Sequence, residues 1–145
     1  MRRRLLLLLA AVGLGWIYLL AFTFAVGVAA TQATPRWWLG LFSKPATSAL
    51  IWLALAHAVA IALVSLPFAW IIGRMYGRLG VPLALAITVT ICAFIEIPAM
   101  SQDFRTVGPL LQSIWVFGAA VLLVALPIAV WGFRAWPSNN RWRGP

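Results

Sequence analysis

The stretch Thr47–Ile72, TSALIWLALAHAVAIALVSLPFAWII, is 26 residues long and contains no Lys, Arg, Asp or Glu. A helix of that length rises roughly 39 Å, which is more than the hydrocarbon thickness of a bilayer. We therefore interpret the stretch as a membrane-spanning helix. It holds the only histidine of the chain, His57, and its LPFA at 66–69 is echoed by LPIA at 126–129.

The composition of the whole chain indicates the same class of protein. Of its 145 residues 64% are hydrophobic and only 9% are charged, and the mean hydropathy is +1.00. A soluble domain needs more charge than this to cover its surface. Each crossing of a bilayer uses ~20 apolar residues. The length therefore predicts one all-α, polytopic membrane domain over residues 1–145, without a soluble catalytic domain.

The apolar runs predict four transmembrane helices in an antiparallel up-down bundle, at about 5–30, 47–72, 81–100 and 109–133. Residues 31–46 are then a surface loop and residues 134–145 a cytoplasmic tail. The first run follows three arginines, as the apolar core of a signal peptide does. A cleaved leader is therefore the alternative to a retained first span, although the 26-residue length favours a span.

Lysine and arginine outside the spans predict the orientation of the protein. With the N-terminus inside, eight of these residues lie on the inner side and three on the outer side. The positive-inside rule then places both termini in the cytoplasm, N-in/C-in, most simply in a bacterial inner (plasma) membrane. Loop charges and contacts with lipid headgroups explain the net charge of +9, so we expect no nucleic-acid partner.

The surface loop contains two adjacent tryptophans, Trp37 and Trp38, between Arg36 and Lys44. Near-helical spacing of apolar residues with flanking cations predicts a short segment in the headgroup region, with its aromatic rings toward the acyl chains. An ordinary aromatic belt and a docking surface for lipids or a partner protein are both compatible with this pattern.

A tight basic turn joins the second and third spans. Residues 73–80, GRMYGRLG, include three glycines together with Arg74 and Arg78. The two arginines can contact an anionic headgroup or an acidic partner. The positive-inside bias alone also explains them.

Two ionisable side chains, His57 and Glu96, lie within the predicted spans, where such groups usually face a partner. His57 precedes Ile72 by 15 residues and Glu96 follows Val81 by 15, so both lie roughly 22 Å from the inner boundary. Spans joined by a short turn pack together, and we expect the pair to meet in the outer half of the membrane. The pair can fix helix packing or form a proton or cation path. The third alternative is that Glu96 simply reaches outer water.

Residues 60–74 and 120–134 align with seven identities, including the pairs Pro67/Pro127 and Arg74/Arg134. The alignment predicts either a parallel duplication of a helical hairpin or a chance match among residues common in spans. Each proline removes one backbone hydrogen bond and is expected to kink its helix.

No sequence motif indicates an enzyme or a cofactor. The chain contains no His-Glu-x-x-His, glycine-rich phosphate loop or recognisable catalytic set. One histidine and one glutamate are too few to hold a metal, and the single cysteine, Cys92, cannot form an internal disulfide. We therefore predict no catalytic, cofactor-binding or metal-binding residues.

The function that we expect is that of a non-enzymatic accessory or assembly subunit of a larger membrane complex. Its partners would be membrane lipids and other membrane subunits or a second copy of itself, packed on small residues such as Gly118, Ala119 and Ala120. The alternative is a small homo-oligomeric, proton-coupled transporter or channel that uses Glu96 and His57.

Overall fold

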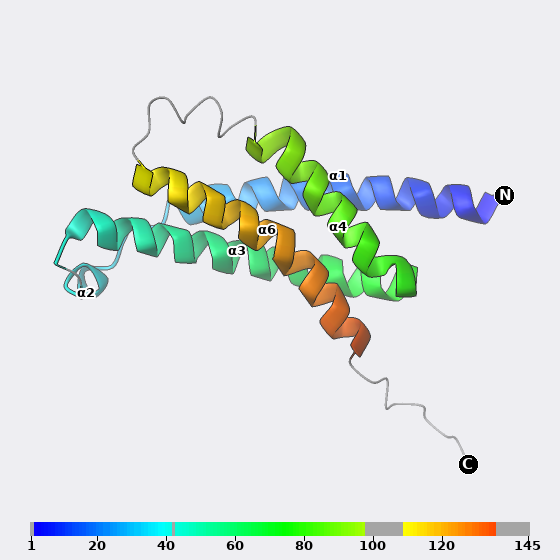
Figure 1. Ribbon diagram of the computed structural model, residues 1–145. Coiled ribbons are helices and arrows are strands. Elements are labelled where there is room, and N and C mark those ends of the chain that lie inside the picture. Colours follow the sequence, from blue (N-terminus) through cyan, green and yellow to red (C-terminus); the bar gives the residue numbers. More distant parts are fainter. Residues whose placement is uncertain (1, 42, 98–108, 136–145) are drawn as a thin grey trace, which may run out of the picture.

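The structure is a computed structural model that describes residues 2–41, 43–97 and 109–135 (Figure 1). Every regular element in these ranges is helical, which confirms the prediction of an all-α protein. The long helices are α1 (Arg2–Ala30), α3 (Pro45–Tyr76) and α6 (Pro109–Ala135). The shorter elements are the helices α2 (Arg36–Leu39) and α4 (Gly80–Ile91), the 3₁₀ turn η1 (Gly77–Leu79) and the π-helix η2 (Cys92–Glu96).

Three helical stretches are long and apolar enough to cross a membrane, namely Leu5–Ala30, Pro45–Ile95 and Trp115–Phe133. Large apolar side chains cover the outside of these stretches, and the rings of Phe24 and Phe94 are 74% and 78% exposed. A soluble protein does not leave so much apolar surface in water. The three stretches therefore indicate a membrane-embedded protein.

The middle stretch, Pro45–Ile95, reverses direction part-way along. Gly77, directly after α3, has a φ of +50°, a conformation that glycine adopts without a Cβ clash. The chain passes through η1, and α4 then runs back across α3 and α6 (Figure 1). Gly80 begins α4, and a Cβ there would lie 3.1 Å from Val130 Cγ1 and 3.4 Å from the Ile72 carbonyl oxygen. The two glycines therefore allow a tight turn followed by close helix packing.

The observed helices differ from the predicted spans mainly in the third. An α-helix was expected over 81–100, whereas the regular α-helix ends at Ile91 and continues as the π-helix η2. Residues 98–108, and residues 136–145 of the expected tail, lie outside the described part of the chain. The expected surface loop contains the short helix α2.

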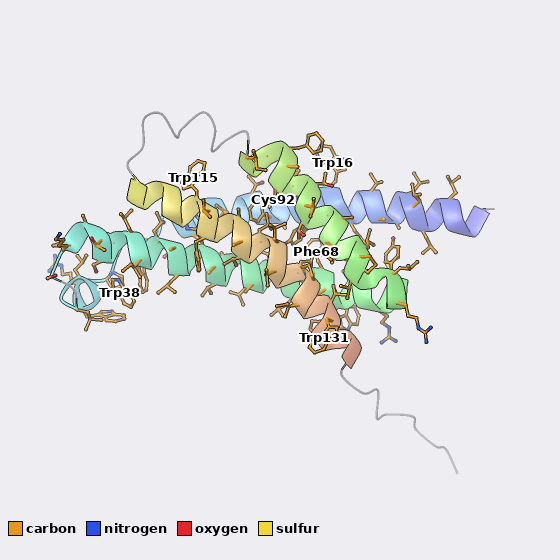
Figure 2. The ribbon with its side chains drawn as sticks, viewed as in Figure 1. Trp16, Trp38, Phe68, Cys92, Trp115 and Trp131 are labelled. Atoms are coloured by element: carbon orange, nitrogen blue, oxygen red, sulfur yellow. The ribbon has the colours of Figure 1, made fainter. Side chains whose placement is uncertain are left out.

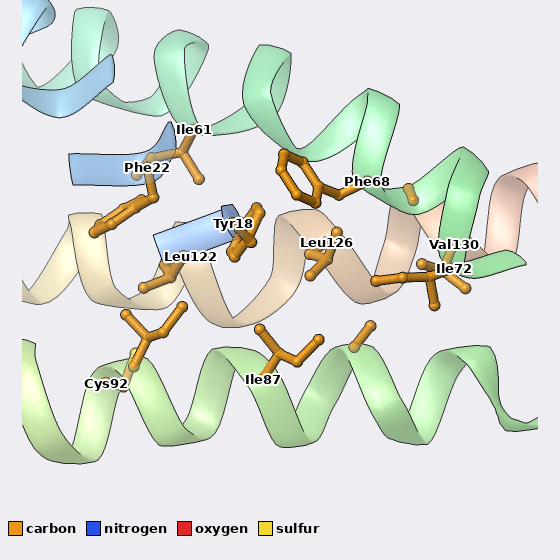
Figure 3. Packing of buried hydrophobic residues seen from close by; sticks show 13 residues of the cluster. Tyr18, Phe22, Ile61, Phe68, Ile72, Ile87, Cys92, Leu122, Leu126 and Val130 are labelled. Atoms are coloured by element: carbon orange, nitrogen blue, oxygen red, sulfur yellow. The ribbon is translucent and has the colours of Figure 1, made fainter. Parts of the chain in front are cut away.

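The core lies where α6 packs between α3 and α4, while α1 packs mainly against α3 (Figure 3). Leu122, Leu126 and Val130 are fully buried along one face of α6 at intervals of four residues. Close packing of this kind holds membrane helices together, because apolar burial adds little where lipid is the solvent. The other helices contribute Tyr18, Phe22, Ile61, Phe68, Ala69, Ile72, Ala84, Ile87, Ile91 and Cys92.

The packing does not follow the 60-residue alignment of α3 and α6. Leu126 is fully buried, whereas Leu66, its equivalent, is 46% exposed. Pro127 is buried, whereas Pro67 is exposed, and both helices continue through their prolines. The aligned residues face different surroundings, so the fold shows no duplicated packing unit.

Candidate functional site

A buried hydrogen-bonded chain links α1 to α3 near the middle of the protein. The Oγ of Ser65 lies 2.7 Å from the Ile61 carbonyl oxygen and 2.9 Å from the hydroxyl oxygen of Tyr18. Because a carbonyl only accepts, Ser65 donates to Ile61 and Tyr18 donates to Ser65. The Tyr18 ring also packs edge-on against Phe68, with 5.1 Å between ring centres. Both hydroxyls are therefore satisfied inside the helix interface.

A second hydrogen bond joins the same two helices, near the start of α1 and the end of α3. The hydroxyl of Tyr76 donates to the Leu7 carbonyl oxygen over 2.7 Å. Eleven residues separate Leu7 from Tyr18 on α1, and eleven separate Ser65 from Tyr76 on α3. Eleven residues are close to three helical turns, so both links lie on one face of each helix. The two helices are therefore antiparallel and in a constant register.

Reciprocal hydrogen bonds hold α2 against the first turns of α3. The indole Nε1–H of Trp38 donates to the Ser48 carbonyl oxygen over 2.9 Å, and the Ser48 hydroxyl donates to the Trp38 carbonyl oxygen over 3.1 Å. The ring of Trp52 lies 5.4 Å from that of Trp38 and 6.2 Å from that of Trp37. Trp38 therefore packs into the protein at the α2 end of the bundle (Figure 2), while Trp37 is 65% exposed.

An apolar groove of about 680 Å³ lies between α1 and α3, and we call it the α1–α3 groove. Its mouth, at Gln32 and Trp52, lies beside α2. Its inner end, at Ala21 and Leu63, lies about one turn from the hydrogen bond between Tyr18 and Ser65. The remaining lining residues are Phe24, Ala25, Val28, Ala29, Leu55, Ala56, Val59, Ala60 and Val64.

The two ionisable residues predicted to meet, His57 and Glu96, lie at a similar depth. His57 is partly buried, and its Nδ1 donates to the Leu53 carbonyl oxygen over 2.8 Å, which leaves Nε2 as the acceptor of the neutral ring. Ile61 and Cys92 lie at the same end of the core (Figure 3), and His57 and Glu96 are each four residues beyond them. The Glu96 side chain is outside the described part of the structure, so contact between the pair stays a prediction.

The predicted headgroup arginines lie at the turn that follows α3. Arg74 and Arg78 are both exposed. The guanidinium carbon of Arg74 lies 5.9 Å from the centre of the Trp70 ring, one helical turn earlier, in a cation–π arrangement. Contact of these arginines with lipid headgroups or an acidic partner is untested and stays a prediction.

Within the described ranges, no three His, Cys, Asp or Glu side chains gather as a metal site would require. The thiol of Cys92 is buried, and its Sγ lies 3.9 Å from the Ala119 carbonyl oxygen of α6.

Sequence reasoning missed Tyr18, Ser65 and Trp52. The only available signal was a polar group inside an apolar run, and such a signal does not name its partner.

Comparisons with known protein families, curated proteins and solved structures find no match to this chain. Any functional assignment therefore depends on the contacts of its own residues.

Proposed function

We propose that this protein is a non-enzymatic accessory or assembly subunit of a larger membrane complex. The observation that carries the proposal is the pairing of its buried hydroxyl groups. Tyr18, Ser65 and Thr88 are almost completely buried. The Tyr18 hydroxyl donates to Ser65 across the α1–α3 interface, while the Ser65 and Thr88 hydroxyls each donate to a carbonyl oxygen of their own helix. The donor of each hydroxyl is therefore used inside the protein, and the Tyr18–Ser65 bond holds two helices together, which supports a packing role for these groups.

The first half of α1 supports this role because its own chain leaves most of it uncovered. Leu6 and Leu9 are 65% and 58% exposed, and the Tyr76 hydrogen bond to Leu7 attaches only one face of the helix. On α6, a Cβ added to Gly118 would meet no atom within 4 Å. Both surfaces have room for a helix of a neighbouring subunit, and small residues favour close helix approach.

We further propose that the chain crosses a bacterial inner membrane four times, with both termini in the cytoplasm. Support comes from the reversal at Gly77, which divides Pro45–Ile95 into two segments of opposite direction. It also comes from the distribution of Lys and Arg, eight on the inner side against three on the outer. Fusions test this directly: green fluorescent protein should fluoresce when attached at the C-terminus, and alkaline phosphatase should be active when inserted after Gly40. The opposite pattern would refute the orientation.

Site-specific crosslinking in native membranes tests the accessory role. A photoreactive amino acid at Leu6 or Leu9 should give an adduct of one defined mass, because these positions face outward. The same amino acid at Leu122, which is fully buried, provides the matched control and should give no adduct. A stable monomer that yields no adduct from either exposed position would contradict the proposal.

A second candidate, a homo-oligomeric proton-coupled transporter or channel, is favoured by the π-helix Cys92–Glu96. Short π-helical segments occur frequently at functional sites. This one ends at Glu96, which we expect at the depth of His57. Proton flux into liposomes should then fall in the Glu96→Gln and His57→Gln variants but not in the Lys44→Gln control. Flux that survives both substitutions, or its absence from the wild-type protein, would remove this candidate.

A further inference from the structure

We propose that the α1–α3 groove binds one acyl chain of an anionic phospholipid, whose headgroup lies at Arg36 and Lys44. The site is independent of the accessory role, because the uncovered first half of α1 lies away from the groove. The argument depends on the lining of the groove, its length and the residues at its mouth.

The lining is suited to a flexible hydrocarbon chain. Small side chains, Ala25 on α1 and Ala56 and Ala60 on α3, leave the space that the two helices do not fill. Apart from Gln32 and the indole of Trp52 at the mouth, every lining side chain is aliphatic or aromatic hydrocarbon. A polar ligand would find no hydrogen-bond partner along the length of this groove.

The length of the groove matches one leaflet of a bilayer. Eleven residues separate Ala21 from Gln32 on α1, and eleven separate Trp52 from Leu63 on α3. At the helical rise this is roughly 16 Å, close to half of the ~30 Å hydrocarbon thickness. Beyond the groove, the α1–α3 interface is closed by the hydrogen bond between Tyr18 and Ser65. An acyl chain ends at that depth, whereas a spanning helix would need a contact surface across both leaflets.

The mouth of the groove has the features of a headgroup site. Arg36 begins α2, four residues after Gln32, and Lys44 directly precedes α3. Both cations are exposed, and no ion pair is found for either of them within the described residues. Tryptophans prefer the headgroup level, and Trp37 and Trp38 follow Arg36 directly in α2. Positive charge at this level selects an anionic headgroup over a zwitterionic one.

Photolabelling of the full-length protein in mild detergent tests the site. The probe is phosphatidylglycerol with a diazirine in one acyl chain, and the labelled positions are read by mass spectrometry. We expect adducts concentrated within residues 21–32 and 52–64, with unlabelled phosphatidylglycerol competing better than phosphatidylcholine. Labels spread evenly over the exposed faces of α1, α3 and α6 would overturn the proposal.

Two sets of variants separate the headgroup contact from the groove. The double variant Arg36→Gln/Lys44→Gln should lower labelling by roughly tenfold or more, because each cation favours anionic lipid. The double variant Arg74→Gln/Arg78→Gln, at the opposite end of α3, is the matched control and should leave labelling within residues 21–32 and 52–64 unchanged. Equal labelling of the two double variants would exclude a headgroup site at Arg36 and Lys44.

Filling the groove should block it. Ala25→Phe places a ring among the lining residues, whereas Ala86→Phe adds the same ring to an exposed position on α4. Only the first should lose groove adducts, and Ala60→Phe provides a second blocking variant if Ala25→Phe fails to fold. Undiminished labelling of both folded blocking variants would overturn the proposal. Capture of a polypeptide by a photoreactive residue at Ala25 in native membranes would also overturn it, in favour of a protein occupant.

Discussion

The hydroxyl of Tyr18 donates to the Oγ of Ser65, 2.9 Å away, and the two partners depend on this contact unequally. Ser65 keeps a second hydrogen bond, to the Ile61 carbonyl oxygen. Tyr18 has only this acceptor within the described residues, and its side chain is fully buried. Loss of Ser65 therefore leaves the Tyr18 hydroxyl unsatisfied, whereas loss of the Tyr18 hydroxyl leaves Ser65 with its bond to Ile61.

We expect Ser65→Ala to destabilise the protein more than Tyr18→Phe does. Tyr18→Phe removes one interhelical hydrogen bond between membrane helices, worth about 0.6 kcal/mol. Ser65→Ala leaves the buried tyrosine hydroxyl without an acceptor, at a cost of about 1–3 kcal/mol. Unfolding in mixed micelles with increasing denaturing detergent measures both, and the double variant should resemble Tyr18→Phe. The reverse order of stabilities would contradict the hydrogen-bond directions.

Among the glycines that the structure describes, Gly80 leaves the least space for a side chain. A Cβ there would lie 3.1 Å from Val130 Cγ1, and Val130 is itself fully buried. Gly80→Val should therefore destabilise the protein by about 1–3 kcal/mol through overpacking. At Gly13 a Cβ would meet no atom within 4 Å, so Gly13→Val should change stability by no more than about 0.5 kcal/mol. The same unfolding assay compares the two, and equal losses would argue against the close approach of α4 and α6.

Trp38, and not Trp37, should hold α2 on α3. Trp38→Phe removes the indole donor to the Ser48 carbonyl oxygen, while Trp37→Phe replaces an exposed indole that makes no such bond by a phenyl ring. Hydrogen exchange of the amides within Arg36–Leu39 reports local opening. We expect faster exchange in Trp38→Phe and an unchanged rate in Trp37→Phe. Equal acceleration in both variants would show that ring stacking, and not the hydrogen bond, holds the segment.

Cys92 should react slowly with thiol reagents while the protein is folded. Its side chain is 6% exposed in the core, and thiol reactivity requires access as well as ionisation. A maleimide should therefore modify the native protein much more slowly than the protein unfolded in denaturing detergent. As a control, a Leu79→Cys substitution combined with Cys92→Ala places the thiol on an exposed turn residue, where labelling should be fast. Rapid labelling of native Cys92 would mean that η2 and α6 separate readily.

Much of the fold was predictable because the backbone of a membrane helix satisfies its hydrogen bonds locally. A run such as Thr47–Ile72 is apolar for longer than a bilayer is thick, so its helical state follows from its own residues. The glycines near residue 77 predicted the turn before α4 for an equally local reason. The π-helix at Cys92–Glu96 was not predicted, because the surrounding apolar residues are compatible with an α-helix.

The candidate site was less predictable, because it depends on how helices rotate against one another. Sequence analysis selected His57 and Glu96 for their charge, and their separation along the helices predicted a common depth. It passed over Tyr18 and Ser65, since a hydroxyl in an apolar run does not identify its partner. The 60-residue alignment was misleading for a related reason. Leucine and alanine recur in every span, and identity in type did not bring Leu66 and Leu126 into equivalent packing.

The sequence by itself determined that the protein is helical and membrane-embedded, because apolar length and backbone hydrogen bonding are properties of each segment alone. Only the tertiary structure decided which faces meet. The register that pairs Tyr18 with Ser65 also leaves the α1–α3 groove open between residues 21–32 and residues 52–64. In lipid, apolar faces are nearly equivalent in energy, so close packing and a few hydrogen bonds select among them. Those contacts join residues far apart in the chain and exist only once the helices are assembled.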